Sequence, residues 1–234
     1  MAIEFKNPAD AVMAQGIKML IFGAAGSGKT VMCATSKEPT LIISTEGGLL
    51  SIKDAPNTIQ IVECNTSAEV EEILTYLETN KRPPWICVDS ISEIGEVVLK
   101  EERAKSPGDN RKPYGELGQI MEVLIKRFRD LPDTHVVMTA KLDSVQDGAS
   151  NAMLYGPGMP GQKTGKAMPY MFDLVGALQV HKDNEGKLIR TLQTNRDGQW
   201  DAKDRSGKLD IYELPNLAHI KSKILGTTAK RKAA

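Results

Sequence analysis

Paired cysteines, a net charge and long apolar runs are all absent from this sequence of 234 residues. Cys33, Cys64 and Cys87 are odd in number and lack metal-ligand spacing, so they indicate buried thiols in a reducing compartment and exclude a disulfide framework. The 30 basic residues equal the 30 acidic ones, so any binding of nucleic acid requires a local basic patch. No apolar run approaches membrane-spanning length and no signal-peptide pattern begins the chain. We therefore expect a cytoplasmic protein with no membrane partner.

The hydrophobic pattern predicts strands that alternate with helices. Residues 67–79 carry a helical apolar stripe behind a capping box formed by Thr66 and Glu69, and residues 117–132 carry a second stripe that Pro132 ends. Such alternation is typical of a mostly parallel sheet covered by helices on both faces. The predicted strands of this first part are 17–22, 40–45, 58–63, 85–90 and 135–140.

The last third of the chain has a different character. Residues 142–171 are rich in Gly, Ser, Asn and Pro, which indicates a long loop with a function of its own. Residues 174–181 and 187–194 then predict an antiparallel hairpin at one side of the sheet. The length allows one sizeable core. We expect an N-terminal extension (1–16), one globular domain (17–225) and a basic tail (226–234).

Residues 23–30, GAAGSGKT, form a complete phosphate-binding loop of the type G-x-x-x-x-G-K-T. The loop follows a predicted strand and precedes a helical stretch, which is the context that the motif requires. Its glycines let backbone N–H groups point at phosphate oxygens, and Lys29 can reach the β- and γ-phosphates. An accidental match in a glycine-rich turn is expected in roughly one chain in a few hundred. The predicted nucleotide contacts are Gly23, Ala24, Ala25, Gly26, Ser27, Gly28, Lys29, Thr30 and Val31.

A magnesium site is expected between this loop and residues 85–90, WICVDS. The Thr30 hydroxyl can ligate Mg²⁺, and an acidic residue at the end of a buried strand, here Asp89, holds the ion through water in phosphate-loop NTPases. The alternative is that Asp89 caps the helix that follows. The loop upstream favours the metal role, with 85–90 predicted to form a strand next to that of the loop.

Residues 40–48, TLIISTEGG, end in a carboxylate, Glu46, and two glycines. Ligands of parallel sheets bind at the carboxyl ends of the strands, so we expect Glu46 to face the terminal phosphate. Here the sequence resembles the RecA/RadA recombinase branch of phosphate-loop ATPases, whose corresponding strand ends in a similar pattern. The resemblance implies that Glu46 is the general base for the attacking water, with Lys29 as a second catalytic residue that contacts the phosphates. The alternative is an exposed glutamate in a turn.

The same resemblance implies roles for later segments. Residues 135–141, HVVMTAK, match a strand that carries a γ-phosphate sensor, and offer Thr139 or Lys141 where recombinases usually have glutamine. Segments 103–118 and 142–171 take the places of two DNA-binding loops, and polar surface loops are the alternative. The implied DNA-binding residues are Arg111, Lys112, Lys163 and Lys166, with Tyr114, Tyr155 and Tyr170 available to stack on bases.

A basic residue near the last strand reaches the neighbouring subunit's nucleotide in ring- and filament-forming RecA-like ATPases. Residues 193–198, QTNRDG, offer Arg196 for this catalytic role, with Arg190 as a second candidate. Such an arginine raises the rate by several orders of magnitude. The alternative is a solvent-facing arginine in a turn. The histidines form no constellation in the sequence and receive no role.

Over most of its length the chain resembles the compact RecA-like ATPases of bacteriophages, including phage single-strand annealing proteins. The specific motifs are GAAGSGKT and STEGG, and the suggestive ones are VDS, PYMFD and KDRSGKLDIYELPNL. The implied fold is an α/β RecA-like P-loop core, with a mostly parallel sheet flanked by helices and an antiparallel hairpin near the C-terminus.

The resemblance implies a Mg²⁺- and ATP-dependent protein that binds single-stranded DNA and assists recombination or annealing. Its implied partners are single-stranded DNA, further copies of the chain in a filament or ring, and a phage or host single-strand-binding protein. Two alternatives remain open. One is a hexameric helicase or translocase motor, and the other is a nucleotide-gated module that recruits proteins and hydrolyses little ATP.

Overall fold

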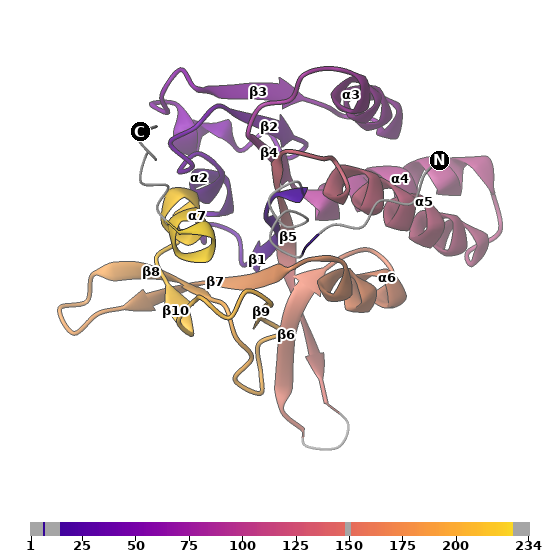
Figure 1. Cartoon of the computed structure of the whole chain (residues 1–234). Helices are drawn as coiled ribbons and strands as arrows, with labels where there is room; N and C mark the ends of the chain where they lie inside the picture. Colours follow the sequence, from indigo (N-terminus) through magenta and orange to yellow (C-terminus); the bar gives the residue numbers. More distant parts are fainter. Residues whose placement is uncertain (1–6, 8–14, 148–150, 227–234) are drawn as a thin grey trace.

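The computed structural model describes residue 7 and residues 15–147 and 151–226. Ten strands of this part form one sheet in the order β10-β8-β7-β1-β5-β4-β2-β3, with β6 paired to β5 and β9 paired to β7 (Figure 1). The strands are β1 (Lys18–Gly23), β2 (Thr40–Ser44), β3 (Ile59–Glu63), β4 (Trp85–Asp89), β5 (His135–Gln146), β6 (Met153–Gly158), β7 (Leu174–Lys182), β8 (Leu188–Gln193), β9 (Lys203–Asp204) and β10 (Tyr212–Glu213).

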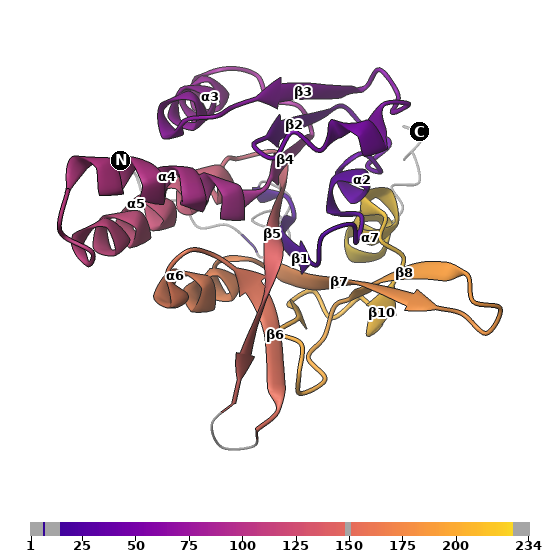
Figure 2. The same ribbon diagram turned by 180° about the vertical axis from the view of Figure 1, so that it is seen from behind.

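All neighbouring pairs from β3 to β7 in this order are parallel, and helices cover both faces of this region (Figures 1 and 2). The pairs of β5 with β6, β7 with β8, β7 with β9 and β8 with β10 are antiparallel. The helices are α2 (Lys29–Cys33), α3 (Ser67–Thr79), α4 (Ile91–Lys105), α5 (Lys112–Arg129), α6 (Gln162–Ala167) and α7 (Leu217–Leu225), with 3-10 turns η1 (Leu49–Ile52) and η2 (Met168–Met171).

Two apolar layers hold the sheet between these helices. Leu20 and Phe22 of β1 pack in the layer under α3, α4 and α5, whereas Met19 and Ile21 pack in the layer under α2 and α7. All four side chains are fully buried. The alternation follows from the two-residue period of a strand, and a strand buried on both faces is apolar throughout. The predicted fold class, an α/β fold with a mostly parallel sheet flanked by helices, is confirmed.

The local helix signals in the sequence are confirmed as well. The Thr66 hydroxyl accepts a hydrogen bond from the Glu69 N–H at 3.2 Å, and the Glu69 carboxylate accepts one from the Thr66 N–H at 3.2 Å. This reciprocal capping box satisfies two backbone donors at the start of α3. Helix α5 ends at Arg129, three residues before Pro132.

Two segments that the sequence predicted to be loops are largely regular, and those predictions were wrong. Within 103–118, α4 continues to Lys105 and α5 begins at Lys112, which leaves a short connection. Within 142–171, β5 continues to Gln146 and β6 pairs with it antiparallel, followed by α6 and η2. Pairing with a partner strand satisfies the backbone of a Gly- and Pro-containing segment that has little periodicity of its own. Residues 148–150 lie outside the described part.

The sequence predicted that the loop strand and the Asp89 strand are neighbours, and this prediction was wrong, because β5 lies between β1 and β4. The predicted hairpin near the C-terminus is confirmed as β7 and β8. The predicted N-terminal extension and basic tail fall almost entirely on residues outside the described part. Within that part, every helix is too short or too polar to cross a bilayer.

Candidate functional site

Four parallel strands end at one edge of the sheet, and each brings a predicted site residue to it. The loop 23–30 follows β1, Glu46 follows β2, Asp89 ends β4, and β5 reaches this edge at Lys141. The register pairs Gly23 of β1 directly with Lys141 of β5. Because carboxyl ends of parallel strands point the same way, residues far apart in the sequence meet here.

The phosphate loop combines two kinds of glycine. Gly26 and Gly28 have φ angles of 74° and 103°, in the left-handed region that favours glycine. Gly23 is required for close packing instead, because a Cβ there would lie 2.6 Å from the Leu178 carbonyl oxygen. Helix α2 behind the loop has only five residues, so anion binding relies on the N–H groups of the loop more than on a long helix dipole.

Lys29 is 9% exposed and lies folded back on the loop. Its Nζ donates to the carbonyl oxygens of Gly23 at 2.9 Å and Ala24 at 3.1 Å. Burial lowers the pKa of Lys29, while the carboxylates of Glu46 and Asp89 oppose the shift. A buried ammonium group held only by carbonyl oxygens is a ready partner for phosphate.

Asp89 joins the loop to β5. Its Oδ2 accepts from the Thr30 hydroxyl at 2.6 Å, and its Oδ1 accepts from the Thr139 hydroxyl at 2.5 Å. Asp89 is 4% exposed, and Ser90 rather than Asp89 caps α4, so the capping alternative is excluded. A hydroxyl and a carboxylate side by side are the hard oxygen donors that Mg²⁺ prefers, so Thr30 and Asp89 are able to hold this ion.

Glu46 lies beside the same group. Its Oε1 accepts a hydrogen bond of 2.5 Å from the buried hydroxyl of Ser90, although the Glu46 residue itself is exposed. An exposed carboxylate held in one orientation has the access to water that a general base requires. The two sensor candidates differ in position. Thr139 contacts Asp89 and is fully buried, whereas the Nζ of Lys141 forms an ion pair of 2.6 Å with Glu93 of α4.

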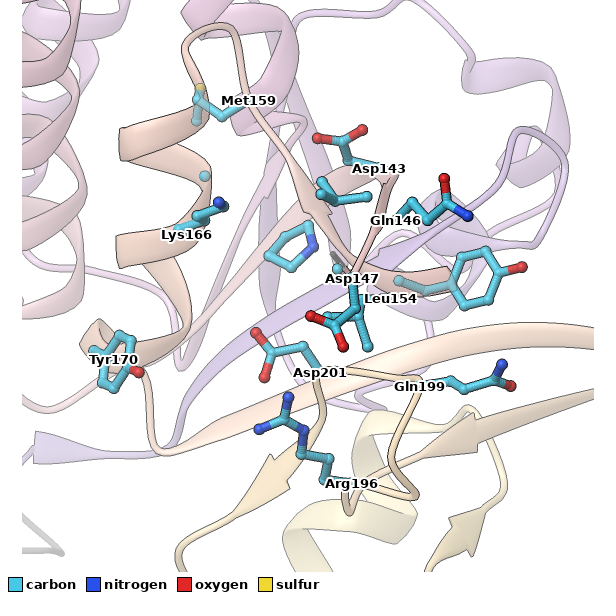
Figure 3. Close-up of a pocket in the computed structure, with 15 residues that line it drawn as sticks. Asp143, Gln146, Asp147, Leu154, Met159, Lys166, Tyr170, Arg196, Gln199 and Asp201 are labelled. Carbon is cyan, nitrogen blue, oxygen red and sulfur yellow. The ribbon is translucent and has the colours of Figure 1, made fainter. Parts of the chain in front are cut away.

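Arg196, Lys163 and Lys166 do not lie at the phosphate loop. Lys166 and Arg196 line a cavity of about 520 Å³ between the β5–β6 hairpin, α6 and the segment after β8 (Figure 3). Lys163 is exposed on α6, and Tyr170 at the rim of the cavity is 78% exposed. The cavity also holds carboxylates. Its lining residues are Asp143, Val145, Gln146, Asp147, Leu154, Tyr155, Gly156, Pro157, Met159, Gly165, Lys166, Tyr170, Arg196, Gln199 and Asp201.

Arg111 and Lys112 lie near the C-terminal end of α4, away from Asp89, which precedes the start of this helix. The helix is about 22 Å long for its 15 residues. Both residues are exposed. The two segments predicted to bind DNA nevertheless meet, because a Cβ on Gly161 would lie 3.5 Å from Cδ1 of Tyr114. The start of α5 therefore packs beside α6.

Sequence reasoning gave no role to Ser90 and did not foresee where Arg190 lies. Ser90 caps α4 by accepting from the Glu93 N–H, and the spacing of Ser90 and Glu93 is a capping signal that the sequence contains. The Nε of Arg190 donates to the carbonyl oxygen of Ser27 at 3.1 Å. The second candidate for an arginine acting on a neighbouring subunit thus contacts the phosphate loop of its own chain, because β8 lies beside β7 near the loop.

Residues 15–206 of the chain match the family described as the AAA domain. No curated protein sequence matches the chain. Among solved structures, the RadB recombinase is 14% identical with a TM-score of 0.43, over 79% of this chain and 84% of that chain. The flagellar accessory protein FlaH from Methanocaldococcus jannaschii is 11% identical with a TM-score of 0.43, over 80% of this chain and 83% of that chain. By the family match, the chain belongs to the AAA domain family, a family of phosphate-loop ATPases.

Proposed function

We propose that the protein is a Mg²⁺-dependent ATP hydrolase that binds single-stranded DNA and assists recombination or annealing. The observation that carries the proposal is the convergence of Lys29, Thr30, Asp89 and Glu46 at one edge of the sheet, beside the hairpin that continues from β5. Hydrolysis is the chemistry that this set of groups supports best, because the set provides a lysine that can donate hydrogen bonds to phosphate, oxygens that can hold a metal, and a base.

Each side chain has a separate task in the proposed reaction. The Glu46 carboxylate takes a proton from water as the water oxygen attacks the γ-phosphorus and the bond to the ADP oxygen breaks. The Lys29 ammonium leaves the carbonyls of Gly23 and Ala24 for the phosphate oxygens, where negative charge accumulates. Thr30 and Asp89 would hold Mg²⁺, which would supply further charge neutralisation when bound.

We place the DNA beside the hairpin, over α6 and the cavity. Lys163 and Lys166 provide exposed positive charge on α6, Arg196 adds a third cation, and Tyr170 offers an exposed ring for a base. Arg205 Nη2 donates to the Tyr170 carbonyl oxygen at 3.3 Å, which brings a fourth cation to the same surface. Helix α6, which has two exposed lysines and no acidic residue, is thus the basic part of this surface.

Replacement of Glu46 by Gln tests the hydrolysis. Gln keeps the shape but takes no proton, so we expect kcat to fall by roughly 100-fold or more while an ATP analogue still binds. Steady-state kinetics and analogue titration measure the two effects, with Glu72→Gln on the exposed face of α3 as the matched control. Unchanged kcat in Glu46→Gln would remove Glu46 from the chemistry. Lost hydrolysis with full recombination activity in cells would favour the nucleotide-gated module instead.

Titration of ATP hydrolysis against single-stranded, double-stranded and no DNA tests the DNA part. We expect single-stranded DNA to stimulate hydrolysis and its binding to weaken steeply with salt. The double variant Lys163→Ala/Lys166→Ala should lower the magnitude of the slope of log K against log[salt] by about 1 to 2. The reason is that each phosphate contact that is lost reduces the number of counterions released on binding. The control is Lys81→Ala/Lys187→Ala, two exposed lysines elsewhere. Equal hydrolysis with and without DNA at all salt concentrations contradicts the proposal.

A further inference from the structure

The first turn of α4 contacts the phosphate-binding edge and the β5–β6 hairpin at the same time. It follows Asp89 directly in the chain. Ser90 contacts Glu46, Ser92 contacts both strands of the hairpin, and Glu93 contacts Lys141. In Figure 2 the hairpin extends away from the body of the sheet, and α4 starts near its base. One rigid turn of helix therefore joins the site of the chemistry to the segment proposed to lie beside DNA.

Ser90 holds Glu46 through a fully buried hydroxyl. This hydroxyl donates to Oε1 of Glu46 at 2.5 Å and accepts from the Glu93 N–H at 3.3 Å. A serine hydroxyl has one proton, so that proton is committed to Glu46. The Ser90 N–H in turn donates to Oγ1 of Thr45 at 3.0 Å, which fixes the residue next to Glu46. The direction of the Glu46 carboxylate therefore depends on the position of Ser90.

Ser92 fixes the base of the hairpin in the same way. Its hydroxyl donates to the Gly158 carbonyl oxygen at 2.6 Å and accepts from the Lys141 N–H at 2.8 Å. Lys141 and Gly158 are the first pair of the β5–β6 ladder, and Ser92 is 2% exposed. The ion pair of Glu93 with Lys141 adds a second connection at the same point. A shift of the hairpin base must therefore move the first turn of α4 or break buried hydrogen bonds.

We propose that Ser90 is a positioning residue for Glu46, and that the first turn of α4 couples Glu46 to the hairpin through Ser92. Single-stranded DNA bound beside the hairpin then improves the aim of Glu46 at the attacking water and raises kcat. This inference rests on the proposed function. Its physical basis is a set of buried and partly buried hydrogen bonds at the two sites, which the backbone of one turn joins because Ser90 and Ser92 are only two positions apart.

Ser90→Ala tests the positioning role. We expect kcat to fall about 10- to 100-fold, the range for loss of a hydrogen bond to a charged group, with KM and the affinity for an ATP analogue within about twofold of wild type. Ser90→Thr keeps the hydroxyl and should restore most of kcat. Because Ser90 also caps a helix, Thr66→Ala at the cap of α3 is the control for loss of a cap alone. Wild-type kcat in Ser90→Ala, or no recovery in Ser90→Thr when thermal unfolding shows a folded protein, overturns the assignment.

Ser92→Ala tests the coupling. We expect hydrolysis without DNA within about twofold of wild type, loss of the stimulation by single-stranded DNA, and faster hydrogen exchange of the backbone at 141–146 because the Lys141 N–H loses its acceptor. Full stimulation in Ser92→Ala overturns the coupling. Wild-type protein that does not hydrolyse ATP refutes the proposed function. If DNA stimulates ATP hydrolysis by the wild type and both serine variants have the same kinetics as the wild type, the coupling alone is refuted.

Discussion

Acidification should destabilise the fold through His135, the first residue of β5. Its Nδ1 accepts a hydrogen bond from the Ile17 N–H at 2.9 Å, and its ring lies on Trp85 with centroids 4.4 Å apart. Burial lowers the pKa of His135 to about 4 from 6.5, with a further contribution from the charge of Lys221. Protonation would place a second donor against the Ile17 N–H, so the folded protein keeps this ring neutral.

The size of the effect follows from the two pKa values. Between pH 6.5 and 4 the unfolded chain binds a proton at His135 and the folded chain does not, so the free energy of unfolding falls as the pH falls through this window. At pH 5 the loss is on the order of 2 kcal/mol relative to pH 7.5, and it approaches about 3 kcal/mol near pH 4. Above pH 7 the residue has no effect of this kind.

Urea denaturation at pH 7.5 and pH 5 measures the loss, and His135→Asn isolates the residue. Asn places an amide oxygen near the position of Nδ1, so it can accept from the Ile17 N–H but does not titrate. Other titrating groups affect both proteins, and the difference between them removes this shared part. Wild type should lose about 2 kcal/mol more than His135→Asn between the two pH values. Equal losses would show that His135 titrates alike in the folded and unfolded chains.

Two further predictions concern the phosphate-binding edge. Lys29→Ala should weaken binding of an ATP analogue by roughly 10- to 100-fold, because a charge-assisted contact with phosphate is lost, and calorimetric titration measures this; unchanged affinity would contradict the assigned phosphate contact. Thr139→Val removes the hydroxyl that donates to Asp89 at nearly constant volume, so kcat at saturating Mg²⁺ should fall about tenfold and the Mg²⁺ concentration for half-maximal rate should change. Magnesium titrations that coincide for wild type and Thr139→Val would exclude a link between Thr139 and the metal-holding carboxylate.

The sequence predicted much of the site because its strongest signals are local. A phosphate loop needs its glycines and its lysine within eight residues, and the capping box at Thr66 and Glu69 needs only four. The contacts of Asp89 with Thr30 and Thr139 could not be predicted in the same way, because 59 and 50 residues separate the partners. Only the order of the strands in the sheet brings such residues together.

The two segments interpreted as loops show where local reasoning failed. Residues 153–158, MLYGPG, contain two glycines and a proline, yet they form β6 because the extension of β5 supplies a partner strand. Propensity in a sheet depends on the neighbouring strand more than on the residue itself. The position of Arg190 at the phosphate loop likewise depends on the pairing of β7 with β1, because the sequence predicted the hairpin of β7 with β8 but not that it lies beside the strand of the loop.

By itself, the sequence determined the alternation of strands and helices, the phosphate loop, and the presence of carboxylates at the ends of two strands, since each is set by residues close together in the chain. Only the tertiary structure decided that β5 lies between β1 and β4, that Thr139 reaches Asp89, and that the first turn of α4 touches both Glu46 and the hairpin. The reason is physical: strand pairing and packing choose among many arrangements of the same local elements, and that choice is made by the buried surface and hydrogen bonds of the whole sheet.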